Sequence, residues 1–214
     1  DINNQFSRNY ELEATFPRIR LRTAGPLITA VYRKFFKVYN DNMEAYARIA
    51  SSEEPRYIAG LYRTRRDDEE ARSDFVFGLD LSDANKAVLS EIEASECAVA
   101  VHVRRGDYAG FAFEVTDSNY FKESIALTAD RAAPRTPIFF VFSDGMDWCR
   151  KNFTGISENL VFAENNDNDH GPADMYLMSR CHHFILSRST FSYWSAFLST
   201  RAPDKMMIWP GKRS

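Results

Sequence analysis

The stretch CAVAVHVRRGDY, from Cys97 to Tyr108, decides how this sequence folds. It begins with a short apolar, partly β-branched run, Cys97–Val103, and changes abruptly to two arginines, a glycine and an aspartate. Continuous apolar runs of this length are typical of strands that are buried on both faces of a parallel sheet. The stretch therefore predicts a buried strand that delivers its arginines to the sheet edge and is broken by Gly106.

Four more apolar runs follow along the chain, and helix-like segments separate most of them. The runs are Ile138–Phe142, Leu160–Phe162, Phe184–Leu186 and a fainter one at Met206–Trp209. The helix-like segments are Tyr120–Asp130, Met146–Phe153, Ala173–Cys181 and Phe191–Ser199. This alternation predicts an α/β domain with a doubly wound parallel sheet that begins near residue 96.

The residues before this domain follow other patterns. Residues 26–39 combine apolar side chains with interspersed basic ones, and a proline stands where a helix could begin. Such a helix either lies on a membrane surface or is partly buried with its lysines reaching solvent, and we favour partial burial. Residues 83–93 predict a short amphipathic helix. We therefore divide the chain into residues 1–95 and 96–214.

Composition and charge exclude some classes of function. The 214 residues are 44% hydrophobic and 27% charged, as in an ordinary globular protein. The net charge of −3 argues against a nucleic-acid partner, because such proteins carry a basic excess. No apolar run reaches the roughly 18 residues that a membrane span needs. Three cysteines without a CxxC pattern favour a reducing compartment.

Polar residues follow each predicted strand where it ends. The carboxyl ends of parallel strands meet at one sheet edge, where ligands bind. The residues concerned are Arg104, Arg105, Asp107, Ser143, Asp144, Glu164, Ser187, Arg188, Ser189 and Thr190. Adjacent guanidinium groups and a helix that starts with Ser-Thr predict a phosphate site. The alternative is that the arginines only pair with carboxylates such as Asp107 or Asp144.

Other short motifs are weaker. No GxGxxG, GxxxxGK[ST] or GxSxG is present, so dinucleotide, P-loop and serine-hydrolase sites have no support. Asp167-Asn168-Asp169 could hold Mg²⁺ against a diphosphate, but an Asn/Asp-rich segment is more typical of a loop. His182 and His183 begin a strand and so face opposite ways, which disfavours a shared metal. The tripeptide Arg105-Gly106-Asp107 occurs on adhesion loops, but here it directly follows a buried strand.

Three motifs, in order, resemble the α-1,2-fucosyltransferases of glycosyltransferase family 11. HVRRGDY, His102–Tyr108, fits the family's H-x-R-R-G-D-Y. FFVFSDGMDWCRKNF, Phe139–Phe153, is similar to its second block. DMYLMSRCHHFILSRSTFSYW, Asp174–Trp194, is similar to its third. The departures are Arg188, Tyr193 and Ser195, where the family usually has Asn, Trp and Gly, and an absent amino-terminal G-G-L-G-N-Q block.

The resemblance implies a GT-B-like enzyme with two Rossmann-like domains. Residues 1–95 would be an incomplete acceptor-side domain, and residues 96–214 would bind GDP-fucose. Fucose would move with inversion to the 2-hydroxyl of a terminal galactose, with no metal or other cofactor required. The resemblance places Arg105 on the donor diphosphate with Arg104 assisting. The implied donor-binding residues are His102, Arg104, Arg105, Ser143, Asp144, Asp174, Ser189, Thr190 and Phe191, with His102 and Asp174 by the guanosine.

The reaction also needs a general base that takes the proton of the acceptor hydroxyl. The candidates for this base are Asp107 and Glu114. Together with Arg105 they are the expected catalytic residues. Alternatively, Asp107 only orients the arginines. Since the G-G-L-G-N-Q block is absent, a nucleotide-sugar-binding homologue without activity is the alternative function. An RGD-type binding module is the least favoured. We expect a cytoplasmic or peripheral membrane location in a bacterium and the Golgi lumen in a eukaryote.

Overall fold

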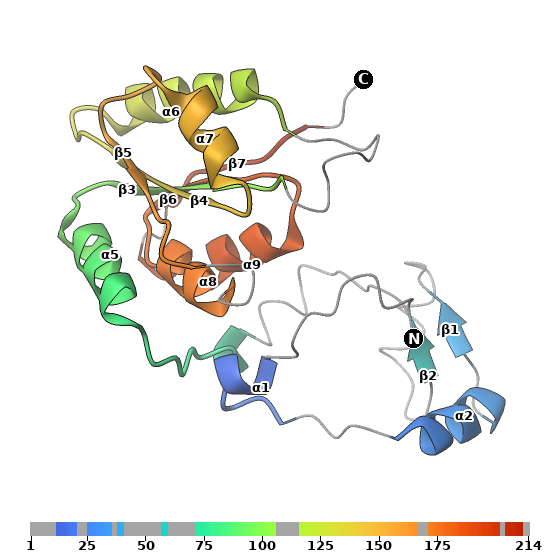
Figure 1. Cartoon of the computed structure of the whole chain (residues 1–214). Coiled ribbons are helices and arrows are strands. Elements are labelled where there is room, and N and C mark those ends of the chain that lie inside the picture. Colours follow the sequence, from blue (N-terminus) through green and yellow to red (C-terminus); the bar gives the residue numbers. More distant parts are fainter. Residues whose placement is uncertain are drawn as a thin grey trace. The chain divides into compact units, whose positions relative to one another are not determined.

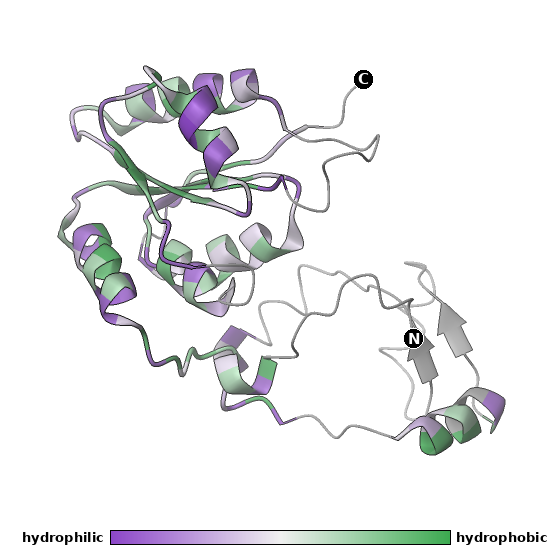
Figure 2. Ribbon diagram, viewed as in Figure 1, coloured by the Kyte–Doolittle hydropathy of each residue, from purple (hydrophilic) through white to green (hydrophobic). Residues whose placement is uncertain are grey.

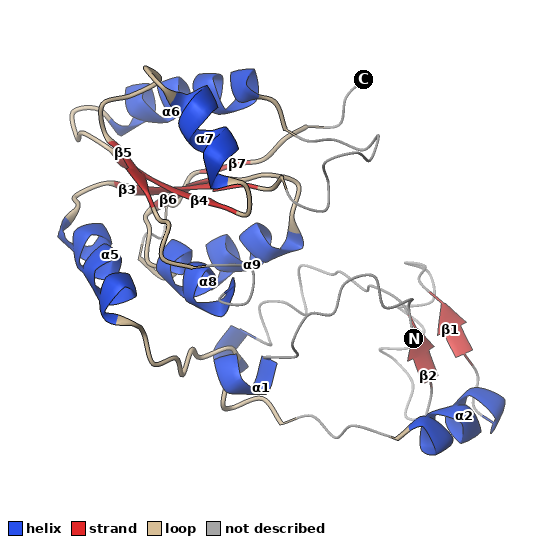
Figure 3. Cartoon of the chain, in the orientation of Figure 1, coloured by secondary structure: helices blue, strands red, loops and turns tan. Residues whose placement is uncertain are grey.

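The chain is seen in a computed structural model that describes residues 12–20, 25–35, 38–40, 57–59, 72–105, 116–166, 171–201 and 204–211 (Figure 3). The described residues from 77 onward form one compact unit, and those from 12 to 76 form another. The larger unit contains every described residue that the sequence predicts at the ligand edge.

The larger unit is built on a five-stranded sheet with the order β5-β4-β3-β6-β7, in which every neighbouring pair is parallel. The central strand β3 is buried along its whole length, because it has a neighbouring strand on both sides and helices on both faces. This confirms the predicted α/β class. The strands are β3 (Ala98–Val103), β4 (Ile138–Ser143), β5 (Leu160–Phe162), β6 (His183–Ile185) and β7 (Met207–Ile208).

Helices cover the sheet on both faces (Figure 1). One face carries α6 (Ser118–Ala132) and α7 (Met146–Phe153), and the other carries α5 (Asp83–Ala94), α8 (Gly171–Ser179) and α9 (Thr190–Leu198). Successive residues of β3 point alternately into these two layers, so Ala98 and Ala100 pack with α8 and α9, whereas Val99 and Val101 pack with α6 and α7. The hydrophobic strands between polar outer helix faces are visible in Figure 2.

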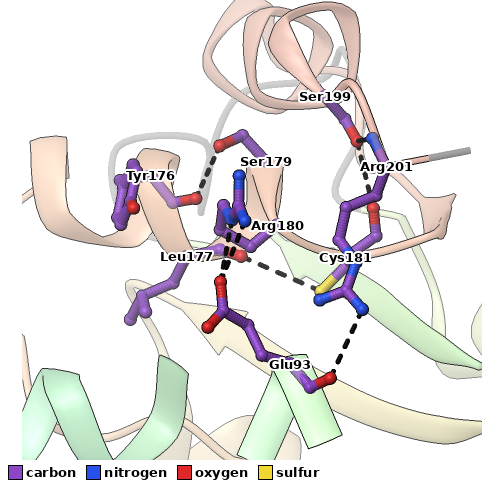
Figure 4. Close-up of polar contacts among 8 residues, drawn as sticks. All are labelled: Glu93, Tyr176, Leu177, Ser179, Arg180, Cys181, Ser199 and Arg201. Atoms are coloured by element: carbon purple, nitrogen blue, oxygen red, sulfur yellow. Dashed lines mark hydrogen bonds and ion pairs between the residues drawn. The ribbon is translucent and has the colours of Figure 1, made fainter. Parts of the chain in front are cut away.

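Helix α5 belongs to this packed layer. Ser82 caps it by accepting a hydrogen bond from the backbone N–H of Asn85, and Val88 and Ile92 face the core. This confirms the predicted amphipathic helix. At its other end, Arg180 pairs with the Glu93 carboxylate at 2.9 Å, and Arg201 donates to the Glu93 carbonyl at 3.4 Å (Figure 4). These contacts join the end of α5 to the residue that follows α8 and to the segment after α9.

The two adjacent histidines have separate structural roles, as the alternation of strand residues predicts. Nδ1 of His182 accepts a hydrogen bond from the Ala98 backbone N–H at 3.0 Å. Nδ1 of His183 accepts one from the Met206 backbone N–H at 3.1 Å. Each ring therefore connects β6 to the start of a neighbouring strand. Within the described residues, no cluster of three or more His, Cys, Asp or Glu side chains is arranged to hold a metal ion.

The smaller unit differs from expectation at residues 26–39. Helix α2 (Pro26–Phe35) ends early, and strand β1 (Val38–Asn40) follows it and pairs in parallel with β2 (Tyr57–Ala59). Val38 and Tyr39 favour strand over helix, which accounts for the early end. The unit's other elements are α1 (Leu12–Thr15) and the 3₁₀ turn η1 (Arg72–Asp74).

Helix α2 also keeps its apolar side chains exposed. Leu27 is 79% exposed and Phe35 is 71% exposed, and Ile28 and Val31 are also exposed. Within the smaller unit, no described element packs over these four side chains, so the expected partial burial is not seen there. None of the helices in the described part is both long and apolar enough to cross a membrane.

Candidate functional site

The ends of β3, β4 and β6 are joined by two serine side chains. Ser187 Oγ donates to the His102 carbonyl at 2.7 Å and accepts from the Arg104 backbone N–H at 3.0 Å. Ser143 Oγ donates to the Val103 carbonyl at 2.8 Å and accepts from the Gly145 backbone N–H at 2.9 Å. The hydroxyls add to the backbone bonds at the strand ends, where the Ser187 N–H also donates to the His102 carbonyl at 3.1 Å. The structure thus brings the predicted rim residues of three strands to one edge.

Arg104 and Asp144 form the central ion pair of this edge. The distance from Arg104 Nη1 to Asp144 Oδ2 is 2.8 Å, and both side chains are largely buried. The other carboxylate oxygen of Asp144 accepts the Arg105 backbone N–H at 2.6 Å. Arginine–carboxylate pairing, the alternative interpretation of the sequence, is therefore present at Arg104. It does not exclude an anionic ligand, because a guanidinium has five N–H donors and one carboxylate cannot accept them all.

Arg105 points elsewhere. Its guanidinium carbon lies 4.2 Å from the centroid of the Trp148 ring, on helix α7. This is a cation–π contact. A Cβ added to Gly145 would come within 2.7 Å of Arg105 Cβ, so only a glycine gives the arginine room here. Of the two adjacent arginines, one pairs with Asp144 and the other packs against α7.

His102 is buried beside the ion pair. It is only 5% exposed, and its ring centroid lies 5.6 Å from that of Phe191. Burial lowers the pKa of His102 to about 4; the Asp144 carboxylate opposes this shift and Arg104 adds to it. The imidazole is therefore neutral at pH 7. Its Nδ1 has no hydrogen-bond partner among the described residues, which leaves that atom able to bind a ligand.

Helix α9 begins at this edge. Ser189 is its N-cap residue, and among the described residues its side chain makes no capping hydrogen bond to the helix. The buried hydroxyl of Ser192, a residue with 0% exposure, donates to the Ser189 carbonyl at 3.1 Å and so does not satisfy any N–H of the first turn. The first-turn N–H groups of an uncapped helix bind anions well. Thr190, at the first helical position, is exposed.

Helix α8 begins against the same group of residues. A Cβ added to Gly171 would meet the Phe191 ring at 3.6 Å, so α8, whose first turn includes Asp174, begins next to Phe191, and the Phe191 ring lies beside that of His102. The Asp174 Oδ1 atom accepts a hydrogen bond from Asn166 Nδ2 at 2.6 Å, and Asn166 is paired with Asn85. Sequence reasoning missed both asparagines. The NNDND run containing Asn166 was visible, but nothing in the sequence linked it to α5.

The other predicted site residues lie apart from this group or are not among the residues that the structure describes. Glu164 forms a paired salt bridge with Arg150 at an exposed position, and Arg188 donates to the Gly211 carbonyl at 2.7 Å. The candidate bases Asp107 and Glu114 lie outside the described residues, as does the Asp167–Asp169 triplet. The structure therefore groups His102, Arg104, Ser143, Asp144, Asp174, Ser189, Thr190 and Phe191 around one edge, with Arg105 directed to α7.

Comparison with known proteins adds an independent result. The model of glycosyl transferase family 11 matches residues 37–209. A galactoside alpha-(1,2)-fucosyltransferase 1 of Lagothrix lagotricha is 32% identical over 142 residues, which cover 61% of this chain and 38% of that protein. A galactoside alpha-(1,2)-fucosyltransferase 2 of Sus scrofa is 38% identical over 106 residues, covering 47% of this chain and 31% of that protein. The matched region thus spans under two fifths of these relatives.

A solved structure shares the fold. The NodZ alpha-1,6-fucosyltransferase soaked with GDP-fucose superimposes with a TM-score of 0.50 over 83% of this chain and 64% of that one. The sequence identity is 17%, so this similarity concerns the fold alone.

Proposed function

The chain belongs to glycosyl transferase family 11, as the motifs predicted, and on that premise we propose that it transfers fucose from GDP-fucose to the 2-hydroxyl of a terminal galactose. The names of its relatives from Lagothrix lagotricha and Sus scrofa support a galactoside acceptor and an α-1,2 linkage. The GDP-fucose soaked into the structure of similar fold supports the donor.

One observation carries the proposal: a buried arginine, a neutral histidine and the uncapped start of α9 lie at one sheet edge. In the transfer, the bond from fucose C1 to the β-phosphate oxygen breaks while the acceptor oxygen bonds to C1 from the opposite side. Negative charge grows on the departing GDP. Preorganised guanidinium and backbone N–H donors stabilise that charge more strongly here than in bulk water.

Arg104 and Arg105 would have different roles in the reaction. The resemblance assigns the diphosphate contact to Arg105, with Arg104 assisting. The geometry favours Arg104 for that contact, because it lies beside His102 and lowers its pKa, while the Arg105 guanidinium packs on Trp148. We therefore assign Arg104 to the leaving diphosphate and Arg105 to holding the turn before α7. Asp107 or Glu114 would take the acceptor proton.

The remaining parts of the proposal rest on the resemblance. Ser189 and Thr190 would hold phosphate oxygens, and Asp174 would lie by the guanine. Transfer without a metal ion, a galactose-terminated glycan as acceptor, and peripheral membrane association stay predictions. So does the location, which would be the cytoplasm or a membrane surface in a bacterium and the Golgi lumen in a eukaryote.

Calorimetric titration of GDP into single variants tests the assignment. Arg104→Ala should weaken GDP binding about ten- to a hundredfold, the effect of losing a charge-assisted hydrogen bond. Arg105→Ala should weaken it less. Arg150→Ala is the matched control, because it removes a cation from the same unit at an exposed pair with Glu164.

The outcomes separate the alternatives. A larger loss in Arg105→Ala than in Arg104→Ala would restore the assignment made from the resemblance. Unchanged GDP affinity in both variants would contradict a diphosphate site at this edge. GDP binding without fucose transfer to lactose would indicate the homologue without activity.

A further inference from the structure

Trp209 directly follows strand β7, at the carboxyl edge of the sheet (Figure 1). Because neighbouring strands of this sheet are parallel, the residues after β7 lie at the same edge as those after β3 and β6. The Trp209 side chain is 39% exposed, although tryptophan is highly buried on average. An exposed aromatic ring beside a binding site is a candidate surface for a ligand.

The backbone on both sides of Trp209 is held by hydrogen bonds. The Ile208 carbonyl accepts from the Leu186 backbone N–H at 2.9 Å. The Gly211 carbonyl accepts from Arg188 Nη2 at 2.7 Å. Both donors belong to the segment that follows β6, so this segment fixes the tryptophan at the sheet edge.

Helix α9 orients the indole ring. The centroids of the Trp209 and Tyr193 rings are 6.2 Å apart, and the two planes meet at 85°. In such an edge-to-face contact, Tyr193 can cover at most one of the two faces of the indole. Arg188 and Tyr193, which hold this segment, are also two of the three departures from the family's third block. The arrangement is therefore a feature of this chain.

We propose that Trp209 stacks against the galactose ring of the acceptor, an inference that rests on the proposed function. The 4-hydroxyl of galactose is axial, so the C–H groups at carbons 3, 4 and 5 form one apolar face of the sugar. That face can pack on an indole while the hydroxyl groups around it stay hydrated. A ring that is already held in place loses little conformational freedom when the sugar binds.

The strand order favours the acceptor over the donor as the occupant. In the order β5-β4-β3-β6-β7, strand β6 separates Trp209 from β3, which carries Arg104 of the proposed diphosphate site. Neighbouring strands lie about 4.8 Å apart, so the ends of β7 and β3 are about 10 Å apart. A phosphate and one sugar ring span such a distance. The acceptor would therefore lie beside the donor, as transfer between them requires.

Saturation-transfer NMR with lactose, a galactose-terminated disaccharide, tests this contact on the full chain in the presence of GDP. Saturation of the protein's aromatic protons should pass most strongly to the galactose protons at carbons 3, 4 and 5. Trp209→Ala should abolish this transfer and raise the KM for lactose about five- to thirtyfold, the effect of exposing a stacked apolar face. The KM for GDP-fucose should stay unchanged. Trp209→Phe should keep part of both effects.

Two controls make the test specific. Met207→Ala removes another exposed apolar side chain of β7, at 38% exposure, and should leave the transfer and the KM for lactose unchanged. Cellobiose ends in glucose, whose equatorial 4-hydroxyl removes the axial arrangement that gives galactose its apolar face. Cellobiose should therefore receive much less saturation from the unsubstituted chain.

The outcomes distinguish this inference from the proposed function. Unchanged transfer in Trp209→Ala, or equal transfer to cellobiose and lactose, would overturn the stacking contact alone. Failure of lactose to bind the unsubstituted chain would overturn it as well. Lactose that binds through Trp209 but receives no fucose from GDP-fucose would overturn the proposed function and leave the stacking contact standing.

Discussion

Position 145 requires a glycine because a neighbouring side chain fills the space beside it, and not because of its own backbone conformation. A Cβ at this position would lie 2.7 Å from Arg105 Cβ and 3.0 Å from Arg105 Cγ. The arginine cannot move away freely, because its backbone N–H is bound to Asp144 and its guanidinium lies on Trp148. The turn after β4 therefore has room for Arg105 only while residue 145 has no side chain.

Gly145→Ala should lower the free energy of unfolding by about 1–3 kcal/mol, the usual cost of overpacking. It should also weaken GDP binding, since the displaced turn carries Asp144, the partner of Arg104. Urea unfolding followed by tryptophan fluorescence measures the first effect, and calorimetry the second. Gly211→Ala is the control, because a Cβ there meets nothing within 4 Å. Equal stability of the two variants would show that the turn can adapt.

For single residues, the sequence indicated which side chains belong to the candidate site but not in which direction they point. The pair Arg104-Arg105 stands out by its chemistry, and the alternation of a strand already implied that the two could not face one ligand while the strand continued. Only the structure shows that Asp144 binds one arginine and Trp148 the other. Those contacts cross between segments about forty residues apart, and no local pattern records them.

The β6 strand is connected to its neighbours by histidine rings as well as by its backbone ladder. His182 Nδ1 accepts the N–H of Ala98, a residue with 0% exposure at the start of β3. Removing the acceptor would leave that N–H unsatisfied. His182→Leu should therefore lower the free energy of unfolding by about 1–3 kcal/mol at pH 7, whereas His182→Asn, whose Oδ1 can replace Nδ1, should cost less. Urea unfolding of both variants measures the difference.

The same bond gives a pH dependence. Burial lowers the pKa of His182 from its ordinary value of 6.5, with Arg201, His183 and Arg135 adding to the shift. Below that ordinary value the unfolded chain binds a proton more readily than the folded chain, so stability falls as pH decreases. The advantage of His182 over Asn should shrink as pH falls from 7 through 6.5 and below. An advantage that stays constant over this range would contradict the role of the neutral ring.

The sequence was most informative about the positions of the helices and strands. The predicted strands and the helices between them lie within a few residues of those in the structure, because buried runs between amphipathic segments leave few alternatives. The helix predicted at residues 26–39 is shorter in the structure, and its expected burial is not seen within its own unit. An apolar helix pattern alone cannot show whether anything covers it, and Leu27 and Phe35 are exposed.

The order of the strands in the sheet could not be predicted from the sequence. Strands β3 and β6 are neighbours although some eighty residues separate them, and their adjacency brings His102 and Ser187 together. That pairing depends on which crossover packs on which face, a property of the assembled unit. The role of α5 was equally hidden. Its pattern predicted an amphipathic helix, yet not that Val88 and Ile92 complete the core beneath α8.

Where the larger unit begins can be tested by truncation. Dividing the chain at residues 95 and 96 stays a prediction, and the packing of α5 argues for an earlier boundary near residue 77. Burying Val88 and Ile92 contributes about 3–6 kcal/mol, a large part of the roughly 5–15 kcal/mol that stabilises a domain. Removing α5 also removes Asn85, which holds Asn166.

Residues 77–214 alone should therefore unfold cooperatively in urea and bind GDP, because every described residue of the candidate site lies within them. Residues 96–214 should lack a cooperative transition or unfold at much lower urea. All three tryptophans, Trp148, Trp194 and Trp209, are present in both pieces, so fluorescence reports on the same core in each. Equal midpoints for the two would place the boundary at residue 96 after all. A loss of GDP binding in a shorter piece that still unfolds cooperatively would show that α5 supports the nucleotide site through the sheet face it covers.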